Sequence, residues 1–183
     1  MNEFQGTRPR MAEPAERICD TRVLCLGNEL IPNDSLGCIV AERIRTLVPD
    51  GVEVVSTSES GFHLLDYLLN ASSLIVVDTL LTGGAPPGTI CEVPASDLDC
   101  VPGGSLHGVG LFDALALARE LRLPAAKQVS IVGVESVDCD IVGGAMHPAI
   151  IETVLAVARI LIERLWARTN NVSNERKNPR FLC

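Results

Sequence analysis

Residues 24–37, LCLGNELIPNDSLG, decide the fold because they join a buried strand to a helix through a glycine turn. The strand is the apolar run at 22–27, which ends on glycine. The helix follows at 34–48, where apolar residues recur at helical spacing before Pro49. A carboxylate, Asp34, stands at the junction, where a nucleotide-binding turn would offer bare N–H groups to a phosphate. The turn therefore suggests a site of a different kind.

The same alternation of apolar strand and amphipathic helix runs through the rest of the chain. The pattern predicts strands at 22–27, 52–56, 73–78, 89–93 and 128–133, and helices at 34–48, 61–70, 107–121 and 148–167. Prolines around the fourth strand indicate a sheet edge. Strands alternating with helices predict a three-layer α/β/α sandwich, with a mostly parallel five-stranded sheet and helices on both faces.

The two ends of the chain differ in composition from its middle. Residues 1–20 are polar and contain two prolines, and residues 169–183 are polar and rich in asparagine. We expect a flexible N-terminal leader at 1–20, a single α/β domain at 21–168 and a polar C-terminal tail at 169–183.

Charge and cysteine content narrow the class of protein. The formal net charge of −8 disfavours binding to nucleic acid or to anionic lipid. The sequence shows neither a signal peptide nor an apolar run long enough to cross a bilayer, so we expect a cytoplasmic protein. None of the seven cysteines forms a C-x-x-C pair, which indicates reduced thiols rather than a thiolate zinc site or a redox pair.

Three polar residues fall where the parallel strands should end. Asp34 follows the first strand, Asp78 closes the apolar run SLIVVD, and His107 stands before the third helix. Ligands of such sheets bind beyond the carboxyl ends of the strands, so we expect these side chains to converge on one edge. Two carboxylates and an imidazole suit a divalent metal ion. They suit general acid–base chemistry equally well, and the residues alone leave both roles open.

Each of these residues also has a purely structural interpretation. Asp34 is suited to cap the first helix, and His107 to hydrogen-bond at the start of another. Asp78 is harder to explain in this way, because a carboxylate at the end of an apolar strand is costly to bury. The convergence of three separate loops favours a functional site over three unrelated structural roles.

Other polar residues are weaker candidates. Glu29 lies in the glycine turn and is a reserve ligand. Asp138 and Asp140 follow the fifth strand, where they are candidates for the rim of the cleft, although solvated loop positions are the simpler interpretation. His63 is expected on a helix surface, and His147 beside the start of the last helix.

A dinucleotide site does not fit the turn. The fingerprint G-x-G-x-x-G requires three glycines directly after the strand. Here Cys25 and Leu30 occupy the first and third of these positions, and Pro32 and Asp34 crowd the helix start. We therefore expect no nucleotide cofactor.

Four stretches taken in order are similar to the signatures of a known family. LGNELIPNDSLG, LIVVDTLLTGGAPPGTI, SLHGVGLFDAL and VSIVGVE resemble successive motifs of the hydrogenase maturation endopeptidases, over residues 23–165. Gly27, Asn28 and Gly37 match the glycine turn of that family, and Gly61 resembles a glycine near its substrate cleft. The resemblance implies an endopeptidase, aspartic-type by family classification, that removes the C-terminal extension from the precursor of a nickel–iron hydrogenase large subunit.

The resemblance also implies which residues contact the metal. The family's three nickel-contacting positions correspond to Asp34, Asp78 and His107. The chain departs from the family pattern at Asn33, which replaces the first of two adjacent acids, and at Cys25, which replaces a glycine. Neither departure falls on an inferred ligand.

In that family the nickel is expected to arrive inside the precursor, so the substrate supplies the metal. Asp34 and Asp78 are the catalytic candidates, and Asp78 is also the candidate base. Two alternatives stay open at this point: a hydrolase or peptidase that holds its own zinc, and a chaperone that binds the large subunit without cleaving it. The sequence does not indicate which hydrogenase is processed or where the cut falls.

Overall fold

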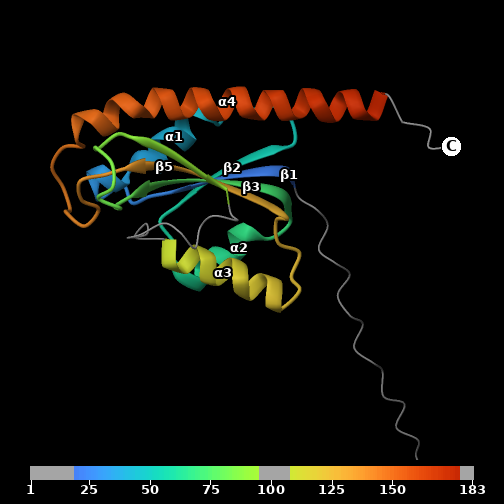
Figure 1. Cartoon of the computed structure of the whole chain (residues 1–183), viewed down its shortest axis with the longest axis horizontal. Coiled ribbons are helices and arrows are strands. Elements are labelled where there is room, and N and C mark those ends of the chain that lie inside the picture. Colours follow the sequence, from blue (N-terminus) through green and yellow to red (C-terminus); the bar gives the residue numbers. More distant parts are fainter. Residues whose placement is uncertain (1–18, 95–107, 178–183) are drawn as a thin grey trace, which may run out of the picture.

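A computed structural model describes residues 19–94 and 108–177 of the chain. These residues form three layers, with a central sheet between two layers of helices (Figure 1). Among the described residues, no helix combines the length and the apolar character that a membrane span needs.

The sheet has five strands, in the order β2-β1-β3-β5-β4. Their bounds are β1 Cys19–Leu26, β2 Val52–Thr57, β3 Ala71–Leu80, β4 Ile90–Pro94 and β5 Gln128–Glu135. Strand β1 pairs in parallel with β2 and β3, and β3 pairs in parallel with β5. Only β4, at the edge, runs antiparallel to its neighbour β5. The expected fold class and the expected edge position of the fourth strand are thus confirmed.

Helices cover both faces of this sheet (Figure 1). Helix α1 (Leu36–Ile44) and the long helix α4 (Pro148–Lys177) lie together on one face. Helix α3 (Gly108–Glu120) covers the other face beside a short 3₁₀ turn, η2 (Gly61–Leu64), and helix α2 (Leu65–Leu68). This is the arrangement of a doubly wound α/β domain.

Alternating side chains of the central strands divide the core in two. In β1, Val23 and Cys25 pack toward α1 and α4, whereas Leu24 and Leu26 pack toward α2 and α3. All four side chains are fully buried. A strand buried on both faces has to be apolar at every position, which accounts for the continuous apolar runs in the sequence.

The glycine turn after β1 is built on close backbone contacts. A Cβ atom on Gly27 would lie 2.3 Å from the carbonyl oxygen of Asp34, and one on Gly37 would lie 1.9 Å from that of Leu26. Only glycine allows these approaches. They hold the backbone of the 3₁₀ turn η1 (Pro32–Asp34) and the first turn of α1 against the end of β1.

Several element boundaries differ from the sequence expectations, and three of them bear on the site or on the expected tail. Helix α1 starts after η1 and ends at Ile44, because Asp34 belongs to the 3₁₀ turn. Strand β3 continues two residues beyond Asp78, since Thr79 and Leu80 still pair with β5. Helix α4 runs ten residues past the expected end at 167, to Lys177, so the first part of the expected tail is helical. The proposed domain limits themselves stay a prediction.

Candidate functional site

Asp34 lies at the end of η1, close to the carboxyl end of β1, and is 2% exposed. It does not cap α1, whose N-cap residue is Ser35. Its Oδ2 instead accepts a hydrogen bond from the backbone N–H of Asn28 at 2.9 Å. Its Oδ1 accepts one from the hydroxyl of Thr79 at 2.8 Å. The sequence-based capping interpretation is therefore wrong, and the carboxylate points inward, toward β3.

Asp78 lies near the carboxyl end of β3, opposite Gly133 of β5, and is 3% exposed. Its Oδ1 accepts a hydrogen bond from the backbone N–H of Thr79 at 2.8 Å. A carboxylate in the middle layer of a sandwich is costly to bury unless polar partners surround it. Its retention at this depth is therefore consistent with a functional role.

One residue, Thr79, connects the two acids. Its backbone N–H donates to Asp78 and its hydroxyl donates to Asp34. The two carboxylates therefore lie on either side of a single residue, although 44 positions separate them in the sequence, from 34 to 78. The structure brings together two of the three expected site residues, and sequence analysis did not identify Thr79. The only sequence signal was a hydroxyl residue directly after the acid of an apolar strand.

Cys139 lies beside the same group. Its thiol, which is 4% exposed at the residue level, donates a weak hydrogen bond to the Thr79 hydroxyl, with 3.6 Å between Sγ and Oγ1. Burial raises the pKa of the Cys139 thiol, the Asp34 and Asp78 carboxylates add to this rise, and hydrogen bonds with Ser136 and Thr79 oppose it. The protonated thiol therefore donates to the Thr79 hydroxyl, and that hydroxyl donates in turn to Asp34.

The third expected residue, His107, lies outside the described residues. Helix α3 begins at the next position, Gly108, and its first turn lies at the end of the molecule where β1 and β3 terminate (Figure 1). A Cβ on Gly110 would come within 2.4 Å of the backbone of Gly61. This close contact between two glycines sets the position of α3 against η2.

Asn33 connects the acid turn to the loop after β5. Its amide donates to Asp138 Oδ2 at 3.0 Å, and its Oδ1 accepts from the backbone N–H of His147 at 2.7 Å. An ionised acid at position 33 would have no donor for Asp138. The amide at position 33 can thus donate to an acid 105 positions later in the chain. The expectation that Asp138 is simply solvated is wrong, because the residue is half-buried and hydrogen-bonded.

Glu135, at the end of β5, holds the glycine-rich loop that follows β3. It is 1% exposed, and it accepts hydrogen bonds from the backbone N–H groups of Thr82 and Gly83 and from the Thr82 hydroxyl, at 2.7–2.9 Å. This buried carboxylate shapes one wall of the region beyond the strand ends. Sequence analysis did not single it out.

The remaining sequence candidates lie at the periphery. Glu29, His63 and Asp140 are exposed. His147 flanks the start of α4, as expected: its Nδ1 accepts a hydrogen bond from the backbone N–H of Ala149 at 3.3 Å. Within residues 19–94 and 108–177, no cluster of three His, Cys, Asp or Glu side chains is arranged to hold a metal ion.

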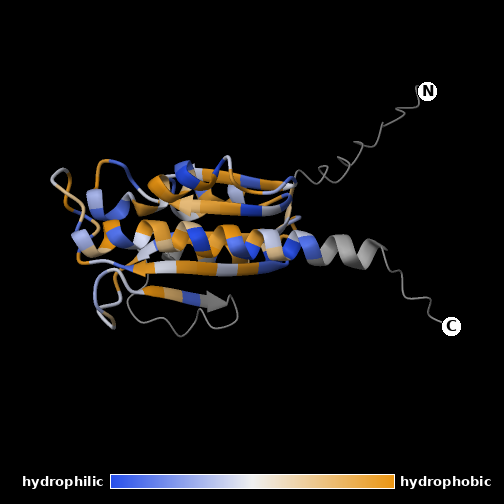
Figure 2. Cartoon of the chain, turned by 90° about the horizontal axis from the view of Figure 1, so that it is seen from above, coloured by the Kyte–Doolittle hydropathy of each residue, from blue (hydrophilic) through white to orange (hydrophobic). Residues whose placement is uncertain are grey.

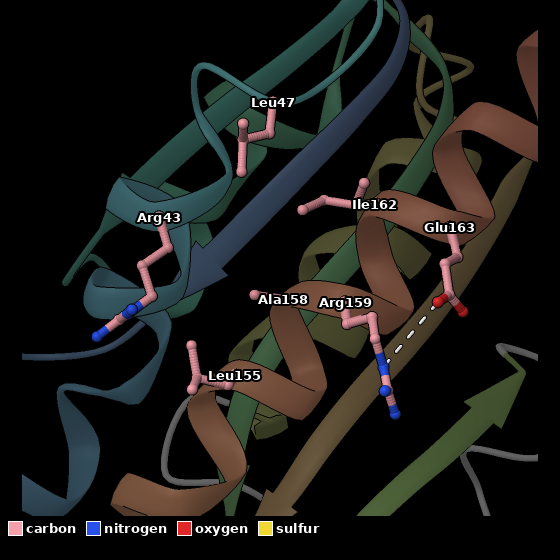
Figure 3. Close-up of a pocket in the computed structure, with 7 residues that line it drawn as sticks. All are labelled: Arg43, Leu47, Leu155, Ala158, Arg159, Ile162 and Glu163. Atoms are coloured by element: carbon pink, nitrogen blue, oxygen red, sulfur yellow. Dashed lines mark ion pairs between the residues drawn. The ribbon is translucent and has the colours of Figure 1, made fainter.

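A separate groove of about 460 Å³ lies between α1 and α4 (Figure 3). Arg43, Leu47, Leu155, Ala158, Arg159, Ile162 and Glu163 line it. Arg159 and Glu163 form an exposed ion pair there, with 3.9 Å between Nε and Oε1. Arg43 lies nine positions beyond Asp34, in the last turn of α1. The groove therefore belongs to the helix layer rather than to the site of the two acids.

The arrangement of the acids defines a class of chemistry. Two buried carboxylates at the carboxyl edge of a parallel sheet can contact a cation or move a proton. Each carboxylate oxygen has more than one acceptor position, so a hydrogen bond from Thr79 leaves the carboxylate able to act as a metal ligand. The fold and the site together define a doubly wound α/β protein with an acidic centre at the carboxyl edge of its sheet.

Solved structures identify this fold. The hydrogenase maturating endopeptidase HybD from Escherichia coli superposes with a TM-score of 0.71, at 22% identity, over 81% of this chain and 93% of that one. The [NiFe] hydrogenase maturation protease HybD from Thermococcus kodakarensis superposes with a TM-score of 0.65, at 21% identity, over 80% and 99% of the two chains. At this level of identity the likeness shows the fold.

Sequence comparison establishes the family. The model of the hydrogenase maturation protease family matches residues 38–164. The hydrogenase 2 maturation protease of E. coli is 32% identical over 151 residues, which cover 75% of this chain and 89% of that protein. The hydrogenase expression/formation protein HupD of Rhodobacter capsulatus is 28% identical, over 86% and 79% of the two chains. The chain belongs to the hydrogenase maturation protease family and is an endopeptidase of that family. Its members cleave the precursor of the [NiFe]-hydrogenase large subunit.

Proposed function

We propose that this endopeptidase removes the C-terminal extension from a large-subunit precursor that already contains nickel, and that Asp34, Asp78 and His107 recognise the nickel. The metal is then part of the substrate. The observation that supports this best is the pair of buried carboxylates joined by Thr79 at the carboxyl edge of the sheet. Carboxylate oxygens together with an imidazole form a suitable donor set for a divalent transition metal.

Burial makes this pair selective for a cation. Removing two carboxylates from water is costly, and a divalent ion offsets that cost when it binds between them. Thr79 holds the acids at a set separation, so the site does not have to reorganise when the metal arrives. A precursor without nickel lacks the charge that would offset the burial, and it is expected to bind more weakly.

The cleavage step requires water to attack a carbonyl of the precursor. Asp78 is the proposed general base that accepts the proton from this water. The proton is then passed to the nitrogen of the leaving peptide, so that hydrolysis yields a carboxylate and an amine. Asp34 accepts two hydrogen bonds of its own and is proposed to stay an ionised contact for the nickel throughout.

The test is cleavage of a purified nickel-loaded precursor by the Asp78→Asn variant, followed by gel electrophoresis. Asparagine preserves the size of the side chain and removes both the base and the negative charge, so we expect the rate to fall at least 100-fold. Asp66→Asn is the matched control, because Asp66 is an exposed carboxylate on α2. Cleavage by Asp78→Asn at the rate of the wild-type protein would sink the assignment.

Nickel dependence separates this proposal from its alternatives. The wild-type protein is expected to cleave the nickel-loaded precursor and to leave the nickel-free precursor intact. Stoichiometric zinc in the purified protein, together with cleavage of the nickel-free precursor, would instead identify a metallopeptidase with its own zinc. Tight binding of the precursor without any cleavage would identify a chaperone.

A further inference from the structure

Apolar side chains are exposed around the two acids. Leu30 is 68% exposed, Leu81 40%, Val137 42%, Ile141 60% and Val142 71%. We call these five residues the apolar rim. They belong to the three loops that follow β1, β3 and β5, and all three loops begin at the carboxyl edge of the sheet. Figure 2 shows hydrophobic positions on the loops at the left end of the sheet, which is this edge.

Hydrogen bonds tie these loops into one surface. The backbone N–H of Gly143 donates to the carbonyl of Leu30 at 3.0 Å, which places Ile141 and Val142 beside the acid turn. The backbone N–H of Ser136 donates to the carbonyl of Leu80 at 2.7 Å, which places Val137 next to Leu81. The three loops that carry the apolar rim are therefore joined by backbone hydrogen bonds, although they come from three parts of the chain.

The charges on these loops are of one sign. Segments 27–35, 81–89 and 136–147 contain no Lys or Arg, whereas their acids are Glu29, Asp34, Asp138 and Asp140. Glu29 stands next to Leu30 and Asp140 next to Ile141, and both acids are exposed. The surface around the two buried carboxylates is therefore apolar with an acidic border.

We propose that the apolar rim docks an apolar segment of the large-subunit precursor that is flanked by Lys or Arg residues and lies next to the scissile bond. The inference rests on the proposed function, because it takes Asp34 and Asp78 as the centre to which the precursor must come. Surface contiguous with that centre has to face the precursor during cleavage. Exposed apolar patches bordered by polar groups are typical of protein-binding surfaces, and the acidic border complements a basic flank.

The apolar rim and the acidic border are expected to affect binding of the precursor in different ways. Burial of the apolar rim slows dissociation and lowers the KM for the precursor. The acidic border acts at longer range, so its contribution is screened as salt rises. Neither component reaches the reacting atoms, so the kcat of bound precursor should depend little on either.

The test is steady-state cleavage of nickel-loaded precursor by two double variants. Ile141→Asn with Val142→Asn is expected to raise the KM about tenfold and to leave kcat within about twofold. Glu29→Gln with Asp140→Asn is expected to raise the KM several-fold at low salt and to have little effect at high salt. Leu121→Asn is the control and should behave as wild type, because Leu121 is 59% exposed but lies beyond the end of α3. Thermal melts show whether each variant is folded.

The outcomes separate failure of this inference from failure of the proposed function. An unchanged KM in the Ile141/Val142 variant, with normal cleavage by the wild-type protein, would overturn docking at the apolar rim. If the wild-type protein does not cleave at all, the proposed function fails, and the affinity of each variant for the precursor still decides the docking question. A wild-type dimer that the Ile141/Val142 variant dissociates, with unchanged precursor affinity, would assign the apolar rim to a second copy of this chain.

Discussion

At the scale of single residues, the site depends on Thr79. Its hydroxyl accepts a hydrogen bond from the Cys139 thiol and donates one to Asp34, while its backbone N–H donates to Asp78. The Thr79 hydroxyl thus orients the Asp34 carboxylate, and the Thr79 backbone N–H orients the Asp78 carboxylate. Thr79 is a positioning residue, since it acts on the reaction through the two acids.

This role can be tested with two substitutions, one that removes the hydroxyl and one that keeps it. Thr79→Val removes the hydroxyl and leaves a buried oxygen of Asp34 without that donor, a loss of about 1–3 kcal/mol in the free energy of unfolding. We expect cleavage of the nickel-loaded precursor to slow at least tenfold. Thr79→Ser keeps the hydroxyl and should restore most of the rate, as measured by the same gel assay.

The comparison between the two variants distinguishes positioning from packing. A purely structural contribution of the Thr79 side chain would make Thr79→Ser, which loses a methyl group, the less active of the two. Activity that is equal in Thr79→Val and in the wild-type protein would show that the hydroxyl plays no part in arranging Asp34.

At the scale of elements, the placement of α3 depends on one close contact. Gly110 in its first turn approaches the backbone of Gly61 in η2, where an added Cβ would lie only 2.4 Å away. Contacts between α3 and the segment formed by η2 and α2 fill the core on that face of the sheet. Helix α3 begins at Gly108, so this contact fixes the start of the helix.

Gly110→Ala is therefore expected to destabilise the protein, even though alanine is the better helix former. The added methyl group forces α3 away from η2, and we expect a loss of about 2–4 kcal/mol in the free energy of unfolding, measured by urea denaturation. Cleavage should fall as well under conditions where the variant is folded. Ala116→Ser, at an exposed position of the same helix, is the control and should cost less than about 1 kcal/mol. A Gly110→Ala protein as stable as the wild type would contradict the close packing.

At the scale of the whole molecule, the buried thiols make stability depend on pH. Burial, the largest cause, raises the pKa of Cys25 from 9.0 to about 12. In the unfolded chain the thiol ionises above pH 9, whereas in the folded protein it stays protonated. The unfolded state therefore binds fewer protons in this range, so the free energy of unfolding falls as pH rises from about 9 to 12.

Between pH 8 and pH 10 we expect Cys25 to contribute a loss on the order of 1 kcal/mol to the free energy of unfolding. Urea denaturation at the two pH values measures the total change. Cys25→Ala removes this thiol, and although the cavity lowers stability at both pH values, the drop between them should shrink by about the same amount. Equal pH dependence in the two proteins would show that the Cys25 thiol ionises alike in the folded and unfolded states.

The fold was predictable from the sequence because its determinants are local. The apolar runs that became β1 and β3, and the glycine turn between β1 and α1, specify each element within a short window. The parallel order of the strands follows from the intervening helices. Element ends were less predictable. Asp78 does not end its strand, and α4 continues to Lys177, because pairing with β5 and helix propensity extend elements past the last apolar residue.

The sequence by itself determined the α/β architecture and the placement of Asp34 and Asp78 at one sheet edge, since periodicity and parallel topology together direct both residues there. Only the tertiary structure decided which side chains at that edge hydrogen-bond to one another. The contact of Thr79 with Asp34 spans 45 positions and that of Asn33 with Asp138 spans 105. Such bonds form within a few tenths of an ångström and a narrow range of angles, and no local pattern in the chain specifies distances between separate loops.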